Sequence, residues 1–521
     1  MGMKQDMEDL LGQSISFGAD IGTSSCFVAY KERDMAPRIP VYPAEYCKGG
    51  VPSLSWRDRD GNEWFCDQVE RKQGLANDPA GVWTSGKMKL DQTSVVLNGH
   101  AYTPRYLMIK QVQRVLELTG QALDDEMVEM DAKLWVVGVP VRFSAAEHRE
   151  LQIILQDATG GATIRLVAEP ILAAIANDYY TKKKGRKARR QLVLDIGGGT
   201  LDVVMLIPNE KPDADHPEPY LALNPDGLRV AGDYMDEKLE EVLLEEIKKN
   251  PGTVNLVNLN NKGHYDRRQL RQVAKDTKER LSSVDSCAVT VTNLDGGKTV
   301  VTVTRQQYEA KIMPMMKEAV ALASDVLKRC DLGANPDIDI LLVGGGSYTP
   351  LLRTLLEKEF SWLPKENIMM RFPERAVALG AAIYAETPQL VRPKIAYGYA
   401  VNTHIDNGKE EVLRVIIPSA ADLPMTVKAD FVTMDANQAS VRFTVYEVPN
   451  TDKKTHMKME AGRVTAYSIS HKFATRVPKD TPVKLTTTLT EDGVLDMTVE
   501  DFRVDQRITH KVFTMNNTIS N

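Results

Sequence analysis

The stretch that decides the fold is VLDIGGGTLDVVML, at residues 193–206. Three consecutive glycines lie between two aspartates, and apolar runs typical of strands flank them on both sides. A second stretch, FGADIGTSSCFVAY at residues 17–30, has the same Asp-Ile-Gly core with a hydroxyl residue close behind it. The repeat predicts two β-hairpins, each with a glycine-containing turn.

Glycine turns of this kind suit the binding of a phosphate. The three glycines at 197–199 would allow positive φ and a close approach, so that successive backbone N–H groups can point at an anion. Thr200 in this copy, and Thr23 and Ser24 in the first, can add hydroxyl donors. A single glycine-rich turn also occurs in ordinary hairpins, but its repetition favours phosphate.

The two aspartates of the repeat, Asp20 and Asp195, would repel a nucleotide unless a cation lay between them and the phosphates. Magnesium is the natural candidate, since it keeps several of its waters and binds through one or two carboxylates. We therefore expect the two hairpins to face each other across one cleft, with Asp20 and Asp195 holding Mg²⁺ through water.

The bulk composition excludes several classes of protein. The formal net charge is only -6 over 521 residues, so no global field argues for nucleic acid. The five cysteines never take C-x-x-C spacing, which argues against a disulfide framework and a zinc site. No apolar run has the length of a membrane helix, and the N-terminus lacks the apolar centre of a signal peptide. We expect a cytoplasmic protein that contacts neither membrane nor nucleic acid.

The pattern of the chain changes once. Strand-like runs alternate with helical segments up to about residue 387, which indicates α/β layers, and short alternating segments separated by turn signals follow. The second part is typical of an all-β sandwich. We expect five regions: an N-terminal tail at 1–14, an α/β domain at 15–387, a linker at 388–396, a sandwich at 397–515 and a C-terminal tail at 516–521.

Several motifs, in order, resemble those of the 70-kDa heat-shock chaperone (DnaK-like) family, within the actin/hexokinase-like ATPase superfamily. They are ADIGTSSCFV (19–28), VGVPVRF (137–143), RLVAEPILAAIA (165–176), LDIGGGTLDV (194–203), LLVGGGSYTPLL (341–352) and PERAVALGAAIYA (373–385). The resemblance implies an actin-like two-lobed ATPase domain followed by a β-sandwich that binds peptide. It further implies a slow ATPase that uses ATP/ADP and Mg²⁺, with K⁺ as a further candidate ion.

The resemblance also implies roles for particular residues. The matched catalytic residues are Lys87, Glu169, Asp195, Thr200 and Asp202, with Thr200 and Lys87 near the γ-phosphate and Asp202 helping to order the attacking water. The matched nucleotide-binding residues are Asp20, Gly22, Thr23, Ser24, Ser25, Gly197, Gly198, Gly199, Thr200, Gly232, Lys278, Ser282, Gly344, Gly345, Gly346 and Tyr348. The ordinary alternatives are a surface lysine for Lys87 and a helix N-terminal carboxylate for Glu169.

The adenosine side of the expected site departs from the family pattern. Lys275 stands where a glutamate is usual, and Glu279 where a basic residue is usual. Tyr348 takes the place of an arginine that stacks on the base, and its aromatic ring can stack equally well. These changes leave the affinity for the nucleotide and the selectivity for its base open.

The C-terminal part resembles the peptide-binding sandwich of the family over ADLPMTVKADFVTMDANQASVRFTVYEV, residues 421–448. The matched pocket positions are Phe431, Met434, Val441 and Phe443, although these residues could equally face the sandwich core. The chain ends soon after its last strands, so we expect no helical lid and rapid exchange of bound peptide. The linker has only Leu390-Val391 as an apolar pair, which favours weakened coupling between the domains.

Three functions remain open. The first is a lidless ATP-driven chaperone for unfolded or extended polypeptide, working with a J-domain co-chaperone and a nucleotide exchange factor. The second is a nucleotide-gated protein that serves one dedicated partner, and the third is a small-molecule kinase, which the sandwich argues against. The basic run TKKKGRKARR at 181–190 is typical of a solvated loop, with docking of an acidic partner or nucleic acid as the alternative.

Overall fold

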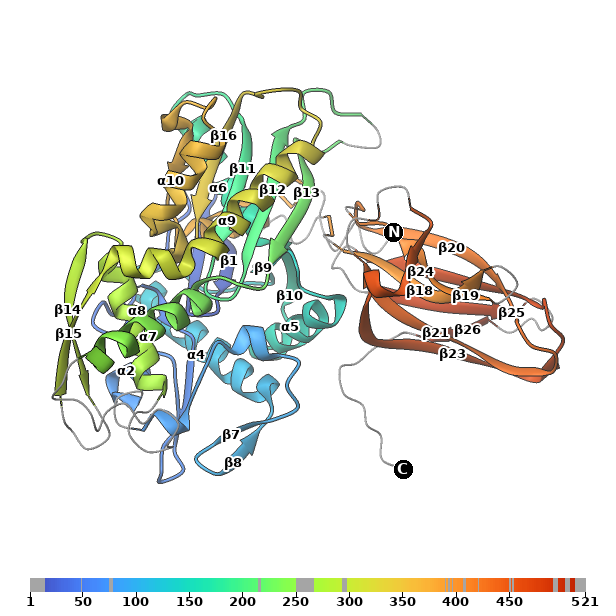
Figure 1. The fold of residues 1–521 in the computed structure, drawn as a ribbon, viewed down its shortest axis with the longest axis horizontal. Coiled ribbons are helices and arrows are strands. Elements are labelled where there is room, and N and C mark those ends of the chain that lie inside the picture. Colours follow the sequence, from blue (N-terminus) through green and yellow to red (C-terminus); the bar gives the residue numbers. More distant parts are fainter. Residues whose placement is uncertain are drawn as a thin grey trace.

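The computed structural model describes residues 15–47, 49–74, 78–213, 217–249, 267–292, 298–388, 390–391, 394–395, 397–405, 409–419, 421–448, 451, 454–490, 495–501 and 507–510. Within these ranges an α/β part is followed by a part built of strands (Figure 1). The last helix of the α/β part, α11, ends at Glu386, and the first strand of the second part begins at Gly398. No helix within the described ranges is long and apolar enough to span a bilayer.

Two five-stranded sheets with the same topology form the centre of the α/β part. In each, a β-hairpin pairs on one side with an antiparallel strand and on the other with two successive parallel strands. The first sheet, in the order β10-β9-β1-β2-β3, consists of β1 (Ile15–Ile21), β2 (Ser25–Glu32), β3 (Val51–Pro52), β9 (Leu134–Val139) and β10 (Thr163–Ala168). The second, in the order β13-β12-β11-β16-β17, consists of β11 (Arg190–Ile196), β12 (Leu201–Pro208), β13 (Tyr220–Leu228), β16 (Ile338–Val343) and β17 (Ile368–Met370).

Helices and smaller sheets surround the two large sheets. The helices are α2 (Asp67–Arg71), α4 (Pro104–Asp125), α5 (Ala145–Ala158), α6 (Glu169–Lys183), α7 (Gly232–Lys249), α8 (Arg267–Leu281), α9 (Arg305–Arg329), α10 (Pro350–Glu359) and α11 (Ala376–Glu386). The small sheets use β4 (Leu54–Arg57), β5 (Glu63–Phe65) and β6 (Val82–Thr84), then β7 (Val95–Leu97) with β8 (His100–Tyr102), and β14 (Ser286–Thr292) with β15 (Lys298–Thr304). Capping boxes define the starts of α5 and α9, because in each the N-cap hydroxyl and the third residue bond reciprocally.

The helices α6 and α11 pack against each other in a shared apolar cluster. Their close approach depends on Gly380 of α11, since a β-carbon there would lie 1.8 Å from the carbonyl oxygen of Leu172 on α6. Gly18 of β1 is equally constrained, because its β-carbon would lie 2.2 Å from the backbone nitrogen of Ala382. The glycines in these two elements therefore fix how α6, α11 and the first sheet pack together.

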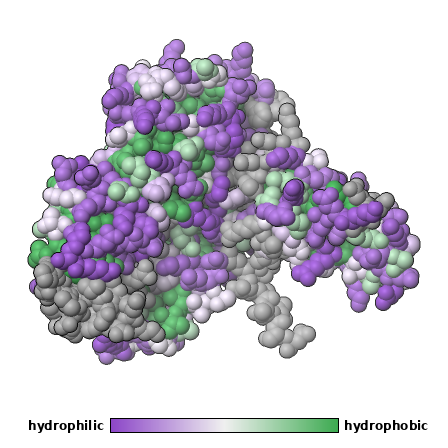
Figure 2. Space-filling view, in the orientation of Figure 1, coloured by the Kyte–Doolittle hydropathy of each residue, from purple (hydrophilic) through white to green (hydrophobic). Residues whose placement is uncertain are grey.

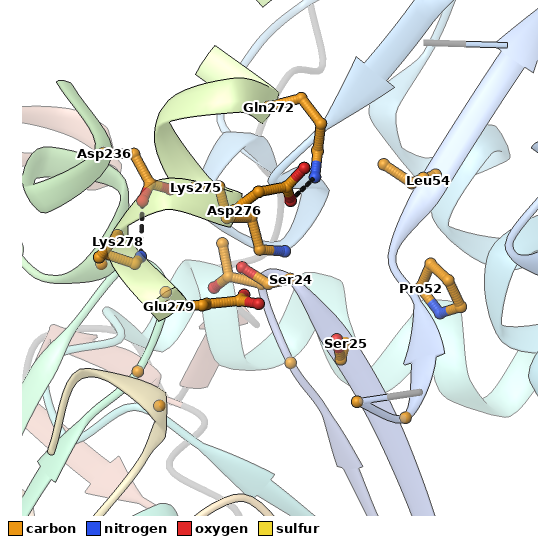
Figure 3. Close-up of a pocket in the computed structure, with 18 of the residues that line it drawn as sticks. Ser24, Ser25, Pro52, Leu54, Asp236, Gln272, Lys275, Asp276, Lys278 and Glu279 are labelled. Atoms are coloured by element: carbon orange, nitrogen blue, oxygen red, sulfur yellow. Dashed lines mark hydrogen bonds and ion pairs between the residues drawn. The ribbon is translucent and has the colours of Figure 1, made fainter. Parts of the chain in front are cut away.

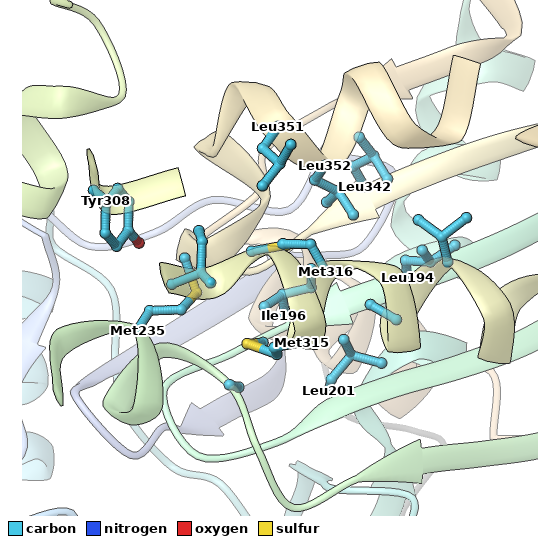
Figure 4. Close-up of a cluster of buried hydrophobic side chains, with 14 of the residues drawn as sticks. Leu194, Ile196, Leu201, Met235, Tyr308, Met315, Met316, Leu342, Leu351 and Leu352 are labelled. Atoms are coloured by element: carbon cyan, nitrogen blue, oxygen red, sulfur yellow. The ribbon is translucent and has the colours of Figure 1, made fainter. Parts of the chain in front are cut away.

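A buried apolar core packs against the strands of the second hairpin (Figure 4). Leu194 and Ile196 of β11 and Leu201 of β12 are fully buried in it, together with Met235 of α7 and Met316 of α9. Fully burying one such side chain contributes about 1.5–3 kcal/mol. The strands on both sides of the glycine turn are therefore held rigidly, which fixes the position of the turn itself.

The C-terminal part is a sandwich of two antiparallel sheets. One sheet, ordered β22-β19-β18-β21-β23, contains β18 (Gly398–Ile405), β19 (Glu410–Ile417), β21 (Gln438–Val448), β22 (His456–Lys458) and β23 (Arg463–Val477). The other, ordered β20-β24-β25-β26, contains β20 (Met425–Val432), β24 (Pro482–Leu489), β25 (Leu495–Asp501) and β26 (Arg507–His510). The short alternating segments expected after residue 387 form β19, β20, β21, β24 and β25.

The apolar linker pair lies against the α/β part. The Tyr220 N–H donates to the carbonyl of Leu390 at 3.2 Å, and Tyr220 forms a parallel bridge with Val391. The Tyr384 hydroxyl donates to the carbonyl of Val391 at 3.0 Å, and Val391 is buried. Leu390 and Val391 of the linker are therefore bound by main-chain contacts, which the sequence did not predict.

The sandwich projects from the α/β part in the space-filling view (Figure 2). Besides the linker, side chains of the two parts also contact each other. The Arg142 guanidinium lies 5.0 Å from the ring centroid of Tyr397, just before β18, and forms an ion pair of 2.6 Å with Asp226. Ala146 of α5 is buried in the apolar cluster of the sandwich. Arg142 follows the strand β9, so the segment after this strand connects the first sheet to the sandwich.

Candidate functional site

A cleft of about 1570 Å³ lies between the two halves of the α/β part (Figure 3). This volume exceeds the roughly 300–1,000 Å³ typical of a small-molecule pocket. Nearly all the nucleotide-site residues expected from the sequence line it. They are Asp20, Gly22, Thr23, Ser24, Ser25, Lys87, Glu169, Asp195, Gly197, Gly198, Thr200, Gly232, Lys278, Ser282, Gly344, Gly345, Gly346 and Tyr348.

The turns of the two hairpins meet in this cleft. A β-carbon on Gly198 would lie 2.7 Å from the hydroxyl oxygen of Ser24 and 3.1 Å from Cβ of Thr23. A β-carbon on Gly199 would lie 2.4 Å from Met88, and Gly199 does not line the cleft. The two turns predicted from the sequence repeat are thus placed against each other.

The expected reason for the three glycines at 197–199 was wrong in one respect. None of them has a positive φ. Gly198 and Gly199 are instead required because the opposite turn and Met88 leave no room for a side chain. Positive φ occurs at Gly344, where a β-carbon would lie 2.6 Å from the Asp195 carboxylate. Close approach, rather than backbone conformation, therefore favours glycine at 198 and 199, whereas a β-carbon on Gly197 would make only an ordinary contact of 3.5 Å.

The start of α7 anchors the second turn. The N–H of Gly232 donates to the carbonyl of Gly197 at 3.0 Å, and the N–H of Asp233 donates to that of Gly198 at 2.7 Å. The Asp233 carboxylate in turn accepts a bond of 2.8 Å from the Ser85 hydroxyl. Because the free N–H groups of a helix start hold the turn carbonyls, the peptide planes of the turn are fixed before any ligand arrives.

Lys87 lies at the bottom of the cleft rather than on the surface. Its side chain is 1% exposed and forms an ion pair of 2.6 Å with Glu169, the first residue of α6. Its ammonium also donates to the carbonyl of Gly138 at 3.2 Å. The neighbouring carboxylates, led by Glu169 and including Asp20, raise the pKa of Lys87 despite its burial. Lys87 is therefore a fixed positive charge in the cleft.

The carboxylates beside Lys87 are crowded. Burial, followed by repulsion from Glu169, raises the pKa of Asp20 to about 7. The same two causes raise the pKa of Asp195 well above its usual range, with Asp202 and Asp20 adding to the repulsion. Such crowding favours a bound cation, and the donors are the oxygens that Mg²⁺ prefers. Within the described residues no group of three or more His, Cys, Asp or Glu is arranged to ligate a metal directly.

Asp202 lies behind the cleft and does not line it. The N–H of Val141 donates to its carboxylate at 3.0 Å, and Asp202 pairs with Asp195 across the hairpin. Burial and repulsion from Glu169 raise the pKa of Asp202 to about 8. We expected Asp202 to help order a water in the cleft. Because Asp202 does not line the cleft, it would have to contact that water from beneath the cleft surface.

The end of the cleft lined by α7, α8 and Tyr348 carries several charges (Figure 3). Lys278 of α8 forms an ion pair of 2.6 Å with Asp236 of α7, so its ammonium is already partnered. Glu279 repels Glu374, whose pKa is raised by burial first and by this repulsion second. The Tyr348 ring lines the cleft and remains 41% exposed, which leaves it free to stack on a base.

The four matched pocket positions of the sandwich have different environments. Phe443 is buried in the core of the sandwich, and its ring lies 4.8 Å from that of Phe431. Phe431 and Val441 are partly buried against the same core, while Met434 is 40% exposed in the turn after β20. Phe443 thus faces the core, whereas Met434 is the most accessible of the four.

The thiols give a pH-dependent prediction. Burial raises the pKa of Cys26 to about 11, and that of Cys47 to about 11. Because the thiolate is the reactive form, both should be nearly inert to a disulfide reagent at pH 8 in the folded protein. Cys330, the only half-exposed cysteine, should react first, and the rate should rise with pH. Full reaction of all five thiols before unfolding would contradict the burial described above.

Sequence reasoning missed several residues that shape the site. The backbone groups of Gly138 and Val141 hold Lys87 and Asp202, and no sequence pattern identifies a single carbonyl or N–H. Asp233 and Asp236 were also missed. Their spacing at i and i+3 near the start of α7, just after Gly232, could have predicted that they share one helix face.

Comparison with known proteins adds independent findings. A family model described as Hsp70 protein matches residues 81–517 of the chain. Among curated proteins, a chaperone protein HscA homolog from Rickettsia peacockii (strain Rustic) is 26% identical over 446 residues, covering 84% of this chain and 67% of that protein. Proteins of the same description from Rickettsia rickettsii strains Sheila Smith and Iowa match with the same identity and coverage.

Proposed function

The chain belongs to the Hsp70 family of nucleotide-dependent chaperones, and on that premise we propose that its cleft binds and hydrolyses ATP to control the binding of extended polypeptide by the sandwich. The observation that carries the proposal is the buried ion pair of 2.6 Å between Lys87 and Glu169, located beside two hairpin turns that touch each other. A buried charge pair beside backbone turns is a suitable environment for a polyphosphate.

Hydrolysis of ATP mainly requires that the attacking water and the γ-phosphate be positioned and that the negative charge of the phosphates be neutralised. Lys87 offers a fixed ammonium that can approach the γ-phosphate, and the Thr200 hydroxyl lies at the end of the second turn. Asp20 and Asp195 would hold the water shell of Mg²⁺, which would neutralise phosphate charge when bound. Glu169, which lines the cleft, and Asp202, which lies beneath its surface, would orient the attacking water.

A steady-state assay of ATP hydrolysis with and without Mg²⁺ tests the enzymatic part. The proposal expects phosphate release that depends on Mg²⁺ and that is lost in Thr200→Ala, while calorimetry still detects nucleotide binding. Thr349→Ala is the matched control, because Thr349 lines the same cleft on the adenosine side. Equal turnover in wild type and Thr200→Ala would contradict the assignment of the second turn to the γ-phosphate.

The sandwich would bind extended polypeptide near its exposed turn. Met434 and the neighbouring Val432, which is 56% exposed, offer apolar surface at the end of β20. Extended segments pair with strand backbone while single side chains fill pockets. A J-domain protein and a nucleotide exchange factor are the partners that such a cycle would use, and one dedicated polypeptide in place of many clients is the alternative.

One helix connects the cleft to the linker, which supports coupling between the domains. The helix α6 begins with Glu169 at the cleft and contains Asp178, which accepts a hydrogen bond from the Tyr220 hydroxyl. The backbone of Tyr220 in turn binds Leu390 and Val391. A change in the partners of Glu169 can therefore shift α6 and the linker together, as coupling between two sites requires.

The contacts that lead from Glu169 through α6 and Tyr220 to the linker predict how bound peptide affects ATP hydrolysis. An unfolded peptide together with a J-domain protein should raise the ATPase rate by about fivefold or more. Val391→Asp should abolish that stimulation, because a carboxylate cannot remain in the buried linker position, while the basal rate persists.

Val432→Asp is the control for the linker variant, since Val432 lies at the end of β20 on the sandwich and is 56% exposed. Val432→Asp should weaken the binding of peptide, but the peptide that does bind should still raise the ATPase rate. Stimulation of Val391→Asp to the wild-type level would show that the linker contact does not transmit the signal.

A further inference from the structure

One surface of the α/β part combines exposed apolar side chains with the basic run of the sequence. We call it the aromatic–basic surface. It lies outside the cleft and adjoins the linker contact, because Tyr179, Tyr180 and Leu390 pack against the same apolar cluster. It consists of Met35, Tyr179, Tyr180, Met370 and Phe372, with Lys183, Lys184, Arg186 and Lys187 along one side. Met35, Met370 and Phe372 are 51%, 41% and 40% exposed.

Contacts of Tyr179 and Tyr180 join the three separate segments that contribute to this surface. The rings of Tyr179 and Tyr180 pack edge to face with centroids 5.4 Å apart, and the Tyr180 ring lies 4.9 Å from that of Phe372. The hydroxyls of Tyr179 and Tyr180 donate to the carbonyls of Met35 and Pro37, both at 3.3 Å. The end of α6 thus joins the loop after β2 to the segment after β17.

The charge along the side of this surface is strongly positive. The four basic residues from Lys183 to Lys187 are exposed, and among the described residues none has an ion-pair partner within 4 Å. Arg189 differs from them, since it is paired with Asp337 and Asp339. The basic run at 181–190 is therefore only partly the solvated loop that we expected. Residues 181–183 end α6 and Arg190 begins β11, and Lys184, Arg186 and Lys187 lie exposed between them.

The acidic groups nearby are few and mostly paired. Glu32 forms an ion pair with Arg38, and Asp178 forms one of 3.0 Å with Lys182. Asp34 is exposed in the loop that carries Met35. Arg371, next to Phe372, donates to the Thr181 hydroxyl at 3.0 Å and adds to the positive side. The net field at this surface therefore favours an anionic partner.

The backbone of Phe372 gives an independent observation. Its φ is +50°, a left-handed conformation that is a genuine outlier for a bulky residue. Asparagine or glycine would adopt this conformation with little strain. Here a residue with a large apolar ring adopts it at the surface instead. Strained residues of this kind gather at functional sites, where the surrounding structure maintains them.

We propose that the aromatic–basic surface is a docking site for an acidic protein segment that carries an apolar side chain. Its carboxylates would pair with Lys183 to Lys187, and its apolar side chain would pack between Phe372 and Met35. The flexible thioethers of Met35 and Met370 can adapt to such a side chain. Partner binding here is distinct from the binding of polypeptide by the sandwich.

A protein segment fits this surface better than a nucleic acid does. Base stacking needs free aromatic faces, but the rings of Tyr180 and Phe372 pack against each other. The Lys183 ammonium lies 5.6 Å from the ring centroid of Tyr179, so that face is also covered. The aromatic residues thus build an apolar surface rather than a stacking platform.

Fluorescence anisotropy at low ionic strength tests the proposal on the full chain. The probe is a fluorescein-labelled peptide of Glu and Asp residues flanking a central Phe-Leu pair. Lys183→Glu with Arg186→Glu should weaken its binding about tenfold, because two attractive charges become repulsive. Phe372→Asn should also weaken it, since asparagine keeps the left-handed backbone but removes the ring.

The matched control is Lys317→Glu with Lys358→Glu, two exposed lysines of α9 and α10, which should leave the affinity unchanged. A peptide with the Phe-Leu pair replaced by serines should bind more weakly than the original. The proposal is overturned if the peptide fails to bind, or if the Lys183/Arg186 variant binds it as tightly as wild type. It is also overturned if labelled oligo-dT binds this surface and the peptide does not.

Discussion

Hydrolysis of ATP by the Lys87→Ala variant is expected to fall by about 10²–10³-fold in kcat, the loss seen when one preorganised charge or donor is removed from a transition state. Lys87 is buried and fixed by Glu169 and by the carbonyl of Gly138. Its charge is therefore in place before the reaction and needs no reorganisation. Single-turnover measurement of phosphate release, with nucleotide affinity from calorimetry, separates the chemical step from binding.

Lys89→Ala provides the matched control for this variant. Lys89 lies on the same short 3-10 turn, Gly86–Lys89, but donates to the carbonyl of Thr84 and does not line the cleft. Its loss should leave kcat near the wild-type value. If Lys87→Ala hydrolyses ATP as fast as Lys89→Ala, the buried ion pair is structural and the proposed site is wrong.

Gly380→Ala is expected to cause the largest loss of stability, about 3 kcal/mol or more in the free energy of unfolding. The new methyl group would lie 1.8 Å from the carbonyl oxygen of Leu172, so α6 and α11 must separate. Because α6 begins with Glu169, the shift should also disturb the cleft. Urea unfolding followed by circular dichroism measures the effect.

The same substitution at Gly120 is the control. Gly120 lies inside α4, and the nearest atom to its added β-carbon is 3.8 Å away. Alanine there should stabilise the protein by about 0.5–1 kcal/mol, since glycine is the weaker helix former. Similar unfolding midpoints for Gly380→Ala and Gly120→Ala would show that the packing of the two central helices is not tight.

Much of the architecture was predictable from local patterns. Period-two and helical spacings identified the strands and helices, and the repeated Asp-Ile-Gly core identified β1–β2 and β11–β12 as equivalent hairpins. The fold class, an actin-like α/β domain followed by a β-sandwich, is confirmed by the sheet topology and the family match. The two-part organisation and the paired hairpins follow from residues that are neighbours in sequence, whereas the actin-like form of the first part was implied by the family resemblance.

The features that escaped prediction depend on contacts between distant segments. The burial of Lys87 depends on Gly138, Glu169 and the first sheet, and alternation alone could not assign Phe443 to the core. The glycines at 197–199 were identified correctly but for a partly wrong reason, because the opposing turn is absent from the local sequence. Contacts across a cleft form only in the folded chain.

A crystal structure with Mg²⁺ and a non-hydrolysable ATP analogue is the most direct test of the central claim. It should place one triphosphate between the turn after Asp20 and the turn after Asp195, with the metal and its waters beside both carboxylates and the Lys87 ammonium near the terminal phosphate. A nucleotide bound elsewhere, or phosphates in contact with only one of the two turns, would contradict it.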